Sequence, residues 1–334
     1  MSVQNYGSIS QRTAVYAAAQ FLEHAMPVTI LEKFASIKPI PKNKSETVTF
    51  RRLIPLNVST TELTEGVTPA SIDISYEDVS ATIKQYGGWS RLTDKVRDLS
   101  EDPVLKDQMQ LHGEVAQETR EQLLWDTIKA GTNVFYATGA TSRVTVAAPI
   151  DRPKQRAITR ALKVQKAKKL NKMLSASAKI GTEAIEASFV CVAHTDLESD
   201  IRDMAGFINV KDYGSSGPIS DYEIGSVEDV RYILSPSLGS WPDAATSGTL
   251  GNLVSTSGTY ADVYPAIYFG MNAFGCVALK GANAVEIRVQ NAGANLTESD
   301  PLGQRGFCSW KTYFTTLILN EAWIARLEVG ATDL

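Results

Sequence analysis

The 334-residue sequence is poor in cysteine, and its three thiols, Cys191, Cys276 and Cys308, lie far apart. An odd number of distant cysteines suggests neither a disulfide framework nor a paired-cysteine metal site, and it favours a reducing compartment. No run approaches the roughly 18 consecutive apolar residues of a membrane-spanning helix. The first thirty residues also lack the apolar core of a secretion signal. We therefore expect a soluble chain of cytoplasmic origin that starts near Met1.

The composition is otherwise that of a protein with a large core. Hydrophobic residues make up 43% and charged residues 21% of the chain, which predicts one large or two coupled domains. Thirty-three basic and 37 acidic side chains give a net charge of -4. That balance argues against a protein whose whole surface binds nucleic acid, so any basic patch must be local.

One such patch is predicted between residues 151 and 172. This segment contains nine basic residues and one acidic residue, so its net charge is +8. We expect a helix over residues 156–175 with Ile158, Leu162, Leu170 and Met173 in the core. Its candidate residues for contact with nucleic-acid phosphates are Arg156, Arg160, Lys163, Lys166, Lys168, Lys169 and Lys172. The segment has no interleaved aromatic residues for base stacking, so a solvated face or pairing with acidic neighbours is the favoured interpretation.

A long acidic hairpin is predicted upstream. Residues 47–53 and 72–83 have strand patterns, and residues 60–69 between them are polar and rich in turn formers. Arms of ten or more residues would reach roughly 35 Å, more than a hairpin needs to cover its own domain. No lysine or arginine occurs between Leu53 and Ile83. We therefore expect docking on a basic neighbour, with these candidate contact residues: Arg51, Arg52, Glu62, Glu65, Asp73, Glu77 and Asp78.

A helix of unusual length is predicted over about residues 103–130. Asp102 can cap its first turn, Pro103 suits the first helical position, and Gly131 can end it. Some 28 residues at 1.5 Å each span about 42 Å. The apolar stripe expected to pack is Leu105, Met109, Ala116 and Leu123, with Val104, Leu111 and Val115 beside it. The acids expected to stay available to solvent or a partner are Glu114, Glu118, Glu121 and Asp126.

The remaining segments complete the expected organisation. Residues 1–44 resemble an arm, with a weak helical pattern that ends at Pro27 and a segment, 38–44, too rich in proline and charge to pack. Residues 188–290 are expected to form an α/β lobe, and residues 310–327 a final strand.

No enzyme motif is present. Cys191 and His194 are spaced as Cys-x-x-His beside Asp196, but Cys191 lies in an apolar strand pattern typical of a buried structural thiol. The stretch 214–217 (Gly-Ser-Ser-Gly) fits neither a nucleophile elbow nor a phosphate loop. We therefore predict no catalytic, cofactor-binding or metal-binding residues.

The order of these elements resembles the major capsid proteins of tailed double-stranded DNA phages with the Hong Kong 97-type fold. The amino-acid sequence at residues 51–53, 63–69 and 85–88 resembles that of the hairpin region in the coliphage N4-like branch. Further similar stretches are residues 192–194, 200–202, 222–225, 230–231, 300–304 and 310–311.

The resemblance implies an α+β capsid fold with four regions. They are an N-arm at 1–44, an extended loop at 45–90, a peripheral domain at 91–187 and 291–334, and an axial domain at 188–290 whose members include His194 and Glu223. It implies no enzymatic activity and no cofactor.

The resemblance also implies partners. Hexamers and pentamers of the chain would form an icosahedral shell around packaged double-stranded DNA. The chain starts at its arm, so a separate scaffolding protein is expected, with a portal protein and a decoration protein as further partners. The hairpin lacks the lysine through which the type member cross-links its shell, so we expect a non-covalent shell. The virion is the expected location, after assembly in the bacterial host cytoplasm.

Two alternatives stay open from the sequence. One is a soluble α/β enzyme with a site in the 188–290 lobe, and the other is a non-specific nucleic-acid-binding protein.

Overall fold

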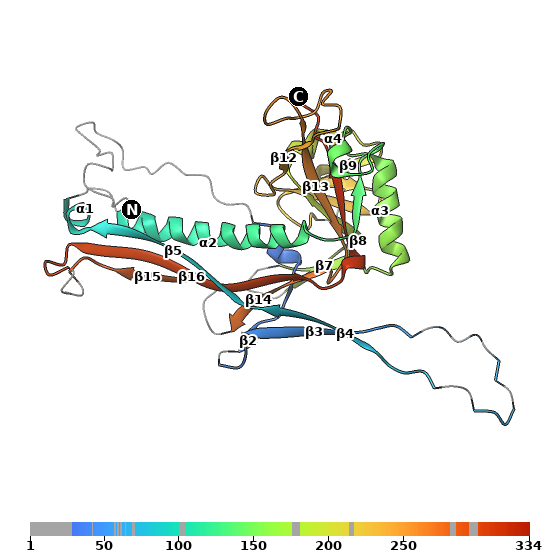
Figure 1. The fold of residues 1–334 in the computed structure, drawn as a ribbon, viewed down its shortest axis with the longest axis horizontal. Coiled ribbons are helices and arrows are strands. Elements are labelled where there is room, and N and C mark those ends of the chain that lie inside the picture. Colours follow the sequence, from blue (N-terminus) through green and yellow to red (C-terminus); the bar gives the residue numbers. More distant parts are fainter. Residues whose placement is uncertain are drawn as a thin grey trace.

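Two large β-sheets, a long helix and a projecting two-stranded hairpin dominate the part of the molecule that the structure describes (Figure 1). The computed structural model describes residues 29–334 except 42, 57, 59, 61, 64, 69, 70, 100–103, 176–180, 214–216, 281–284 and 294–299. Of residues 97, 172–175, 181–186 and 280 it describes the backbone alone. Within these described parts no helix is long and apolar enough to cross a membrane. Many strands and few helices give the mixed α and β composition that was predicted.

The first sheet has six strands and is built around the longest of them, β16. Its strands are β1 (Ser36–Ile37), β2 (Ile40–Pro41), β5 (Lys84–Thr93), β14 (Phe274–Lys280), β15 (Glu286–Gln290) and β16 (Arg305–Ile318). Ten residue pairs join β16 to β5 in antiparallel register, from Arg305 with Thr93 to Phe314 with Lys84. Inward residues alternate with outward ones along β16, so one face of this sheet is covered and the other is open.

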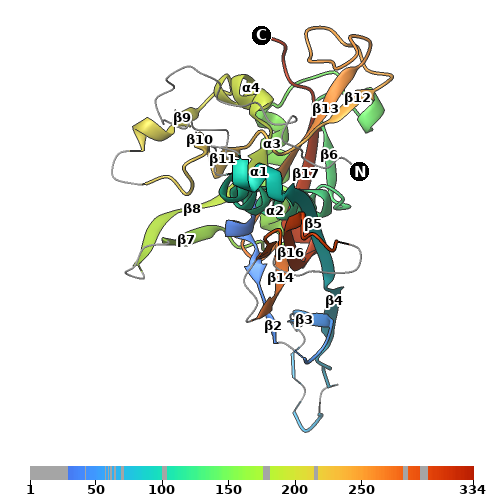
Figure 2. The same cartoon turned by 90° about the vertical axis from the view of Figure 1, so that its left-hand side faces the viewer.

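The second sheet has nine strands and holds the largest apolar cluster. Its strands are β6 (Val134–Tyr136), β7 (Leu170–Ser175), β8 (Gly181–Ala193), β9 (Phe207–Asn209), β10 (Glu223–Val227), β11 (Val230–Leu234), β12 (Trp241–Ala245), β13 (Ala261–Phe269) and β17 (Ile324–Val329). The central strands β11 and β13 are buried throughout, as expected for strands covered on both faces. Helices α3 (Arg152–Val164) and α4 (Glu198–Arg202) lie against this sheet, and the β7–β8 pair projects from it (Figure 2).

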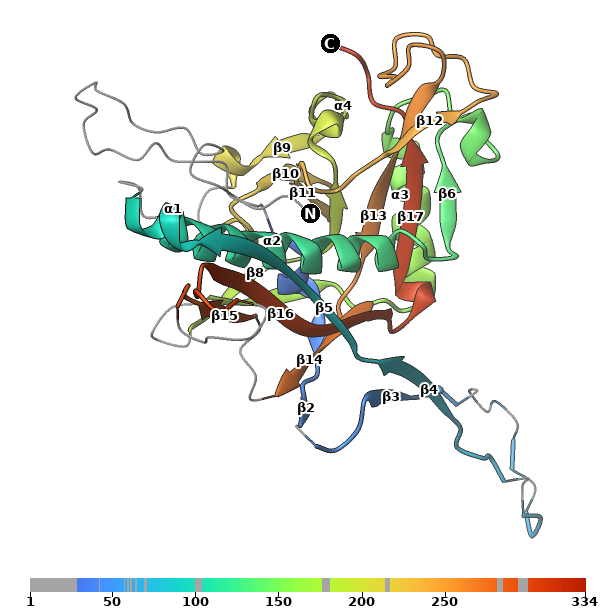
Figure 3. The same cartoon turned by 60° about the vertical axis from the view of Figure 1, so that its left-hand side comes forward.

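The predicted long helix is confirmed as α2 (Val104–Ile128), which runs along the six-stranded sheet (Figure 3). Asp102 and Pro103 lie outside the described residues. The predicted apolar stripe is wrong in part, because Met109, Leu111 and Val115 are 40%, 51% and 47% exposed. The face turned inward instead includes Leu124, Trp125, Ile128 and two charged residues.

Those two charged residues hold the arm, which corrects the expectation that Glu121 stays available to solvent. Glu121 is 3% exposed and its Oε1 accepts the backbone N–H groups of Ile30 and Leu31, both at 2.9 Å. Arg120 pairs with Glu32 and lies over the Phe314 ring, 4.7 Å from its centroid. Polar residues can occupy an inward face when each finds a partner there, which an apolar stripe pattern does not reveal.

The arm also packs further along, although segment 38–44 was predicted to stay unpacked. Ile40 is 2% exposed in an apolar cluster with Val277 and Leu317, and Ile40–Pro41 pairs in parallel with β14. Proline fits here because strand β2 has only two residues and lies at the sheet's edge. The helical pattern before Pro27 lies outside the described residues.

The predicted hairpin is present but its paired part is shorter. Strand β3 (Thr47–Leu53) is confirmed, and seven residue pairs join it to β4 (Tyr76–Thr82). The second strand was expected to begin at residue 72, yet residues 71–75 are not in a strand. The hairpin points away from both sheets (Figure 1). After β5 a short helix, α1 (Asp94–Leu99), leads to α2.

The helix predicted over 156–175 is wrong in its second half. Helix α3 ends at Val164, the chain reverses with Lys166 at a φ of 55°, and residues 170–175 form β7. Lys166, Lys168, Lys169 and Lys172 are therefore not helical. The pairing of β7 with β8 is a long-range contact, and it overrides a local composition that favours a helix.

The single final strand predicted over 310–327 is two strands in different sheets. A short 3-10 turn at Glu321–Trp323 separates β16 from β17. The sheets likewise do not divide at residues 188 and 290. β6, α3 and β17 belong with the nine-stranded sheet, whereas β14 and β15 belong with the six-stranded one.

A buried ion cluster joins α2 to the nine-stranded sheet. Glu328 on β17 is fully buried and accepts two hydrogen bonds from Arg143, at 2.9 and 2.7 Å. Arg326 Nε lies 2.8 Å from the same carboxylate, and its Nη1 donates to the carbonyl oxygens of Lys129 and Gly131 just after α2. The orphan carbonyls at the helix end are thus satisfied by a residue of β17.

We predict that Tyr232→Phe destabilises the nine-stranded sheet more than Tyr268→Phe does. The Tyr232 hydroxyl donates to Gln155 Oε1 at 3.0 Å and lies 3.1 Å from the Tyr268 hydroxyl, all fully buried. Losing the Tyr232 hydroxyl leaves Gln155 Oε1 without this donor and should lower the free energy of unfolding by about 1–3 kcal/mol. Tyr268→Phe keeps that bond. Urea unfolding of isolated subunits measures both, and equal losses would contradict the network.

Candidate functional site

The base of the hairpin is held by ion pairs within the chain. Arg51 donates to both carboxylate oxygens of Asp78, at 2.8 and 2.9 Å, and Arg52 Nε donates to Glu77 at 2.7 Å. The Arg51 guanidinium lowers the pKa of Asp78 through its hydrogen bonds. Each pair faces across the β3–β4 ladder, where opposite charges favour the register. Four of the seven predicted contact residues therefore neutralise one another.

The other three, Glu62, Glu65 and Asp73, are exposed in the hairpin tip, which we define as residues 54–75. The tip carries three carboxylates and no basic residue. Large apolar side chains surround them and are 44% to 88% exposed in and beside the tip: Leu53, Ile54, Leu56, Val58, Leu63, Val67, Ile72, Ile74 and Tyr76. So many exposed apolar side chains in one projection mark an interaction surface. The sequence-based interpretation concerned the acidic residues and did not identify the apolar residues as an interaction surface. The sequence does show those apolar residues, between the turn-forming ones.

Three residues of the basic segment pair with the turn that joins β10 to β11. Arg156 Nε donates to Glu228 at 2.8 Å, while Lys163 and Lys169 both pair with Asp229. These contacts lower the pKa values of Glu228 and Asp229 below their ordinary range. Pairing with acidic neighbours, the interpretation favoured for this segment, thus holds for these three residues.

Three candidates for genome contact are exposed and form no ion pair with the residues that the structure describes. They are Arg160 on α3, and Lys166 and Lys168 in the turn after it. The side chain of Lys172 lies outside the described atoms. The basic charge that stays unpaired within the described residues is therefore smaller than the +8 of the segment suggests.

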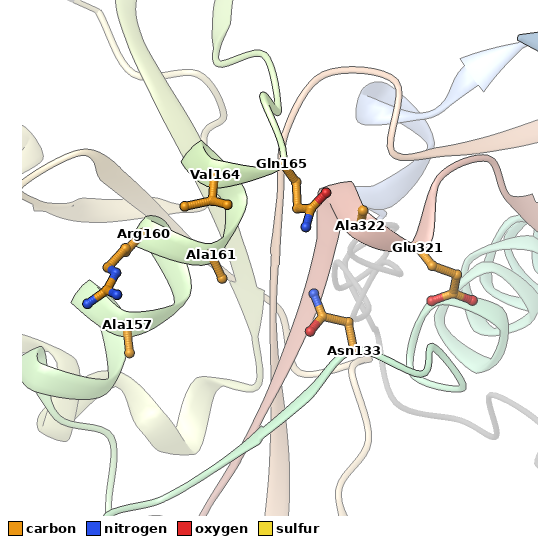
Figure 4. A pocket seen from close by; sticks show the side chains of 8 residues that line it. All are labelled: Asn133, Ala157, Arg160, Ala161, Val164, Gln165, Glu321 and Ala322. Carbon is orange, nitrogen blue, oxygen red and sulfur yellow. The ribbon is translucent and has the colours of Figure 1, made fainter. Parts of the chain in front are cut away.

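A shallow hollow of about 550 Å³ lies beside α3 (Figure 4). Arg160 stands on the α3 wall, and Glu321 lies in the opposite wall, where it accepts the Thr132 backbone N–H at 3.1 Å. The other lining residues are Asn133, Ala157, Ala161, Val164, Gln165 and Ala322. None belongs to the 188–290 lobe in which an enzyme site was the alternative expectation.

The Cys-x-x-His residues have structural surroundings. Cys191 is fully buried, and burial raises the pKa of its thiol. His194 Nδ1 accepts the Asp196 backbone N–H at 3.2 Å, and Asp196 accepts from the Tyr264 hydroxyl at 2.7 Å. Among the described residues no group of three or more His, Cys, Asp or Glu could hold a metal ion.

Glu223, the other residue singled out in this lobe, is also satisfied within the chain. It is 7% exposed and accepts hydrogen bonds from the Tyr213 hydroxyl at 2.7 Å and the Ile219 backbone N–H at 2.6 Å. Arg231 lies 3.5 Å from the same carboxylate. These contacts give Glu223 a structural role.

Comparison with known families matches residues 76–327, about three quarters of the chain, to a family described as phage capsid protein. The chain belongs to this family. A major capsid protein of Pseudomonas phage KPP21 is 25% identical to this capsid protein over 179 residues. That alignment covers 50% of the present chain and spans only 45% of the relative's length.

Solved phage capsids share the fold of this capsid protein along almost its whole length. The capsid of Ralstonia phage GP4 matches with a TM-score of 0.71 and 14% identity, covering 100% of this chain and 99% of that one. The head structure of Helicobacter pylori bacteriophage KHP40 matches with a TM-score of 0.67 and 10% identity. The match covers 99% of this chain and 98% of that one. This capsid protein is therefore a structural component of a phage shell, and the predicted structural role is confirmed at that level.

We predict that Asp229→Asn makes the capsid protein less sensitive to acid. Lys163 and Lys169 hold the pKa of Asp229 below its ordinary value, so its contribution to stability is present above the unfolded pKa near 4. That contribution is lost as the pH falls through the lower folded pKa. Thermal unfolding from pH 6 down to pH 2.5 should show a smaller decrease in Tm for the variant than for the parent. Asp212→Asn, which removes another exposed carboxylate, is the control, and identical pH profiles for Asp229→Asn and the parent would refute the contact.

Proposed function

We propose that this capsid protein is the major head protein of a tailed phage. Its hexamers and pentamers would form an icosahedral shell of the Hong Kong 97 type around double-stranded DNA. The observation that carries this proposal is the exposed, apolar and acidic tip on a hairpin that points away from its own sheets. A monomer gains nothing from that surface, whereas a shell of identical subunits buries it once per copy. The resemblance to the coliphage N4-like branch supports placing the chain there.

The regions of the fold would then have distinct places in the shell. Residues 1–44 serve as the N-arm and 45–90 as the extended loop. The six-stranded sheet with α2 forms the peripheral domain, and the nine-stranded sheet forms the axial domain around each hexamer or pentamer axis. By this division β6, α3 and β17 are axial and β14 and β15 are peripheral, which revises the boundaries expected from the sequence.

Docking of the hairpin would depend mainly on apolar burial. The ion pairs at its base leave only Glu62, Glu65 and Asp73 to meet a neighbour's charges. Burying one exposed Leu or Val side chain contributes roughly 1.5–3 kcal/mol, whereas an exposed ion pair contributes about 0–1 kcal/mol. Charge would select the position on the neighbour, and apolar contact would supply most of the affinity.

The remaining partners follow from the same proposal. A separate scaffolding protein guides assembly, a portal admits the genome, and a decoration protein can reinforce the shell. Arg160, Lys166 and Lys168 offer phosphate contacts without sequence preference. The hairpin tip has no lysine, so the shell is held without covalent links from this loop. Assembly takes place in the bacterial host cytoplasm.

Expression of the chain with and without its scaffolding partner tests the proposal. Negative-stain microscopy and size-exclusion chromatography should show shells or capsomers of megadalton size. A sharp peak at the mass of a monomer or dimer under every assembly condition would overturn it.

We predict that the double substitution Leu63→Ser and Val67→Ser lowers the yield of shells about tenfold or more at every salt concentration, because it removes apolar contact. Glu65→Lys should lower the yield chiefly at low salt, where charge contacts are strongest. Glu77→Lys should act differently, since it repels Arg52 within the same hairpin. Leu334→Ser removes an even more exposed side chain at the far end of the chain and serves as control. Full yield from the double variant would contradict apolar docking.

A further inference from the structure

The hairpin leaves the body of the molecule as a separate two-stranded ribbon. Among the described residues β3 pairs with β4 alone, and neither strand pairs with the six-stranded sheet. The chain runs directly from β4 into β5, with Ile83 as the single residue between the two strands. Backbone pairing therefore does not fix the angle at which the hairpin leaves the sheet. That angle depends on side-chain packing at the hairpin root, which we define as residues 47–50 and 79–83.

A segment of the arm fills the space between this root and the six-stranded sheet (Figure 1). Ile40 of β2 is 2% exposed, and β2 pairs in parallel with β14 at the edge of the sheet. The apolar cluster around Ile40 contains Val277 and Leu317 from the sheet and Ala81 from the root. Further root side chains that pack against this cluster are Val48, Phe50, Val79 and Ile83. One isoleucine of the arm therefore contacts both the sheet and the hairpin.

Lys38, two residues before Ile40, connects the same two parts by hydrogen bonds. Its backbone N–H donates to the Cys276 carbonyl oxygen of β14 at 3.2 Å, and its ammonium donates to the Thr49 carbonyl oxygen of β3 at 3.1 Å. The ammonium also lies 5.0 Å from the centroid of the Phe50 ring, within the range of a cation–π contact. Lys38 thus binds the sheet through its backbone and the hairpin through its side chain.

The arm is fixed to the body independently of the hairpin. Glu121 of α2 accepts the backbone N–H groups of Ile30 and Leu31, and β1 pairs in parallel with β14. The segment that follows, with Lys38 and Ile40, is therefore a support that stays with the six-stranded sheet.

We infer that Ile40 and Lys38 are positioning residues, which hold the hairpin at the angle that assembly requires. This rests on the proposed function, in which the hairpin contacts a neighbour. The seven residues of β3, at roughly 3.3 Å each, carry the hairpin about 23 Å from its root, so a tilt of about 20° displaces the far end by about 8 Å. A hairpin already fixed at the correct angle loses less conformational freedom when it docks.

Distances between spin labels in the unassembled full-length chain test the inference. The labels are attached to Leu53→Cys at the end of β3 and to Ile287→Cys on β15. The native cysteines are 0% or 1% exposed, so labelling is selective. Pulsed electron paramagnetic resonance should give one narrow distance distribution for this doubly labelled parent.

Ile40→Ala should widen that distribution about twofold or more, because it removes the apolar contact between the arm and the root. Ile37→Ala shortens a 59% exposed isoleucine of the same arm and is the matched control, which should keep the parent width. Equal widths in the two variants would overturn the inference.

Lys38 gives a second test with a smaller disturbance of the core. Lys38→Ala removes the contacts with Thr49 and Phe50 and should widen the distribution. Lys38→Arg keeps a cationic donor and should keep the parent width. If Ile40→Ala does not fold, this pair of variants decides the outcome, and a parent-like width for Lys38→Ala overturns the inference.

Assembly kinetics connect the angle to the function. Ile40→Ala should form shells about threefold or more slowly than Ile37→Ala, as measured by light scattering. Equal rates despite a widened distribution would show that the hairpin docks without a fixed angle, which would overturn the positioning role. Failure of the unmodified chain to assemble would instead overturn the shell proposal, and the spin-label distances would still decide whether the arm fixes the hairpin.

Discussion

The buried carboxylate of Glu328 is the constraint on which the arrangement of the two sheets depends. It is held by Arg143 and Arg326, and Arg326 at the same time binds the carbonyl oxygens that follow α2. One guanidinium therefore belongs both to the nine-stranded sheet and to the end of the helix that supports the six-stranded sheet. Removing Glu328 would leave the buried Arg326 guanidinium without its counter-charge, which proteins tolerate poorly. The two sheets are thus connected by hydrogen bonds as well as by apolar packing.

Local patterns in the sequence were sufficient to predict the helices and strands whose extent depends on neighbouring residues in the chain. The bounds of β3 followed from its strand pattern, and the extent of α2 followed approximately from its helix-start and helix-stop residues. These local patterns failed where pairing with a distant strand decides the secondary structure of a segment. Residues 170–175 have a composition that suits a helix, but β8 pairs with them. Nothing near residues 319–323 indicates that the chain passes from one sheet to the other, because that depends on what β16 and β17 each pair with.

The candidate site shows the same division. The acidic residues of the hairpin could be read directly, but the partners of Glu77 and Asp78 required the β3–β4 register, which pairs them with Arg52 and Arg51. Glu121 was taken for a solvent-facing residue because its partners are backbone N–H groups about 90 positions earlier. Charge patterns in a sequence count side chains, whereas the surface that a neighbour meets depends on which charges are already paired.

The three cysteines have a consequence for the life of the particle. Cys191, Cys276 and Cys308 are all buried, and burial raises the pKa of each thiol, so the reactive thiolate form is scarce and shielded. A shell made of such subunits would not form stray disulfides in an oxidising medium. Its integrity would then be independent of the redox potential of its surroundings.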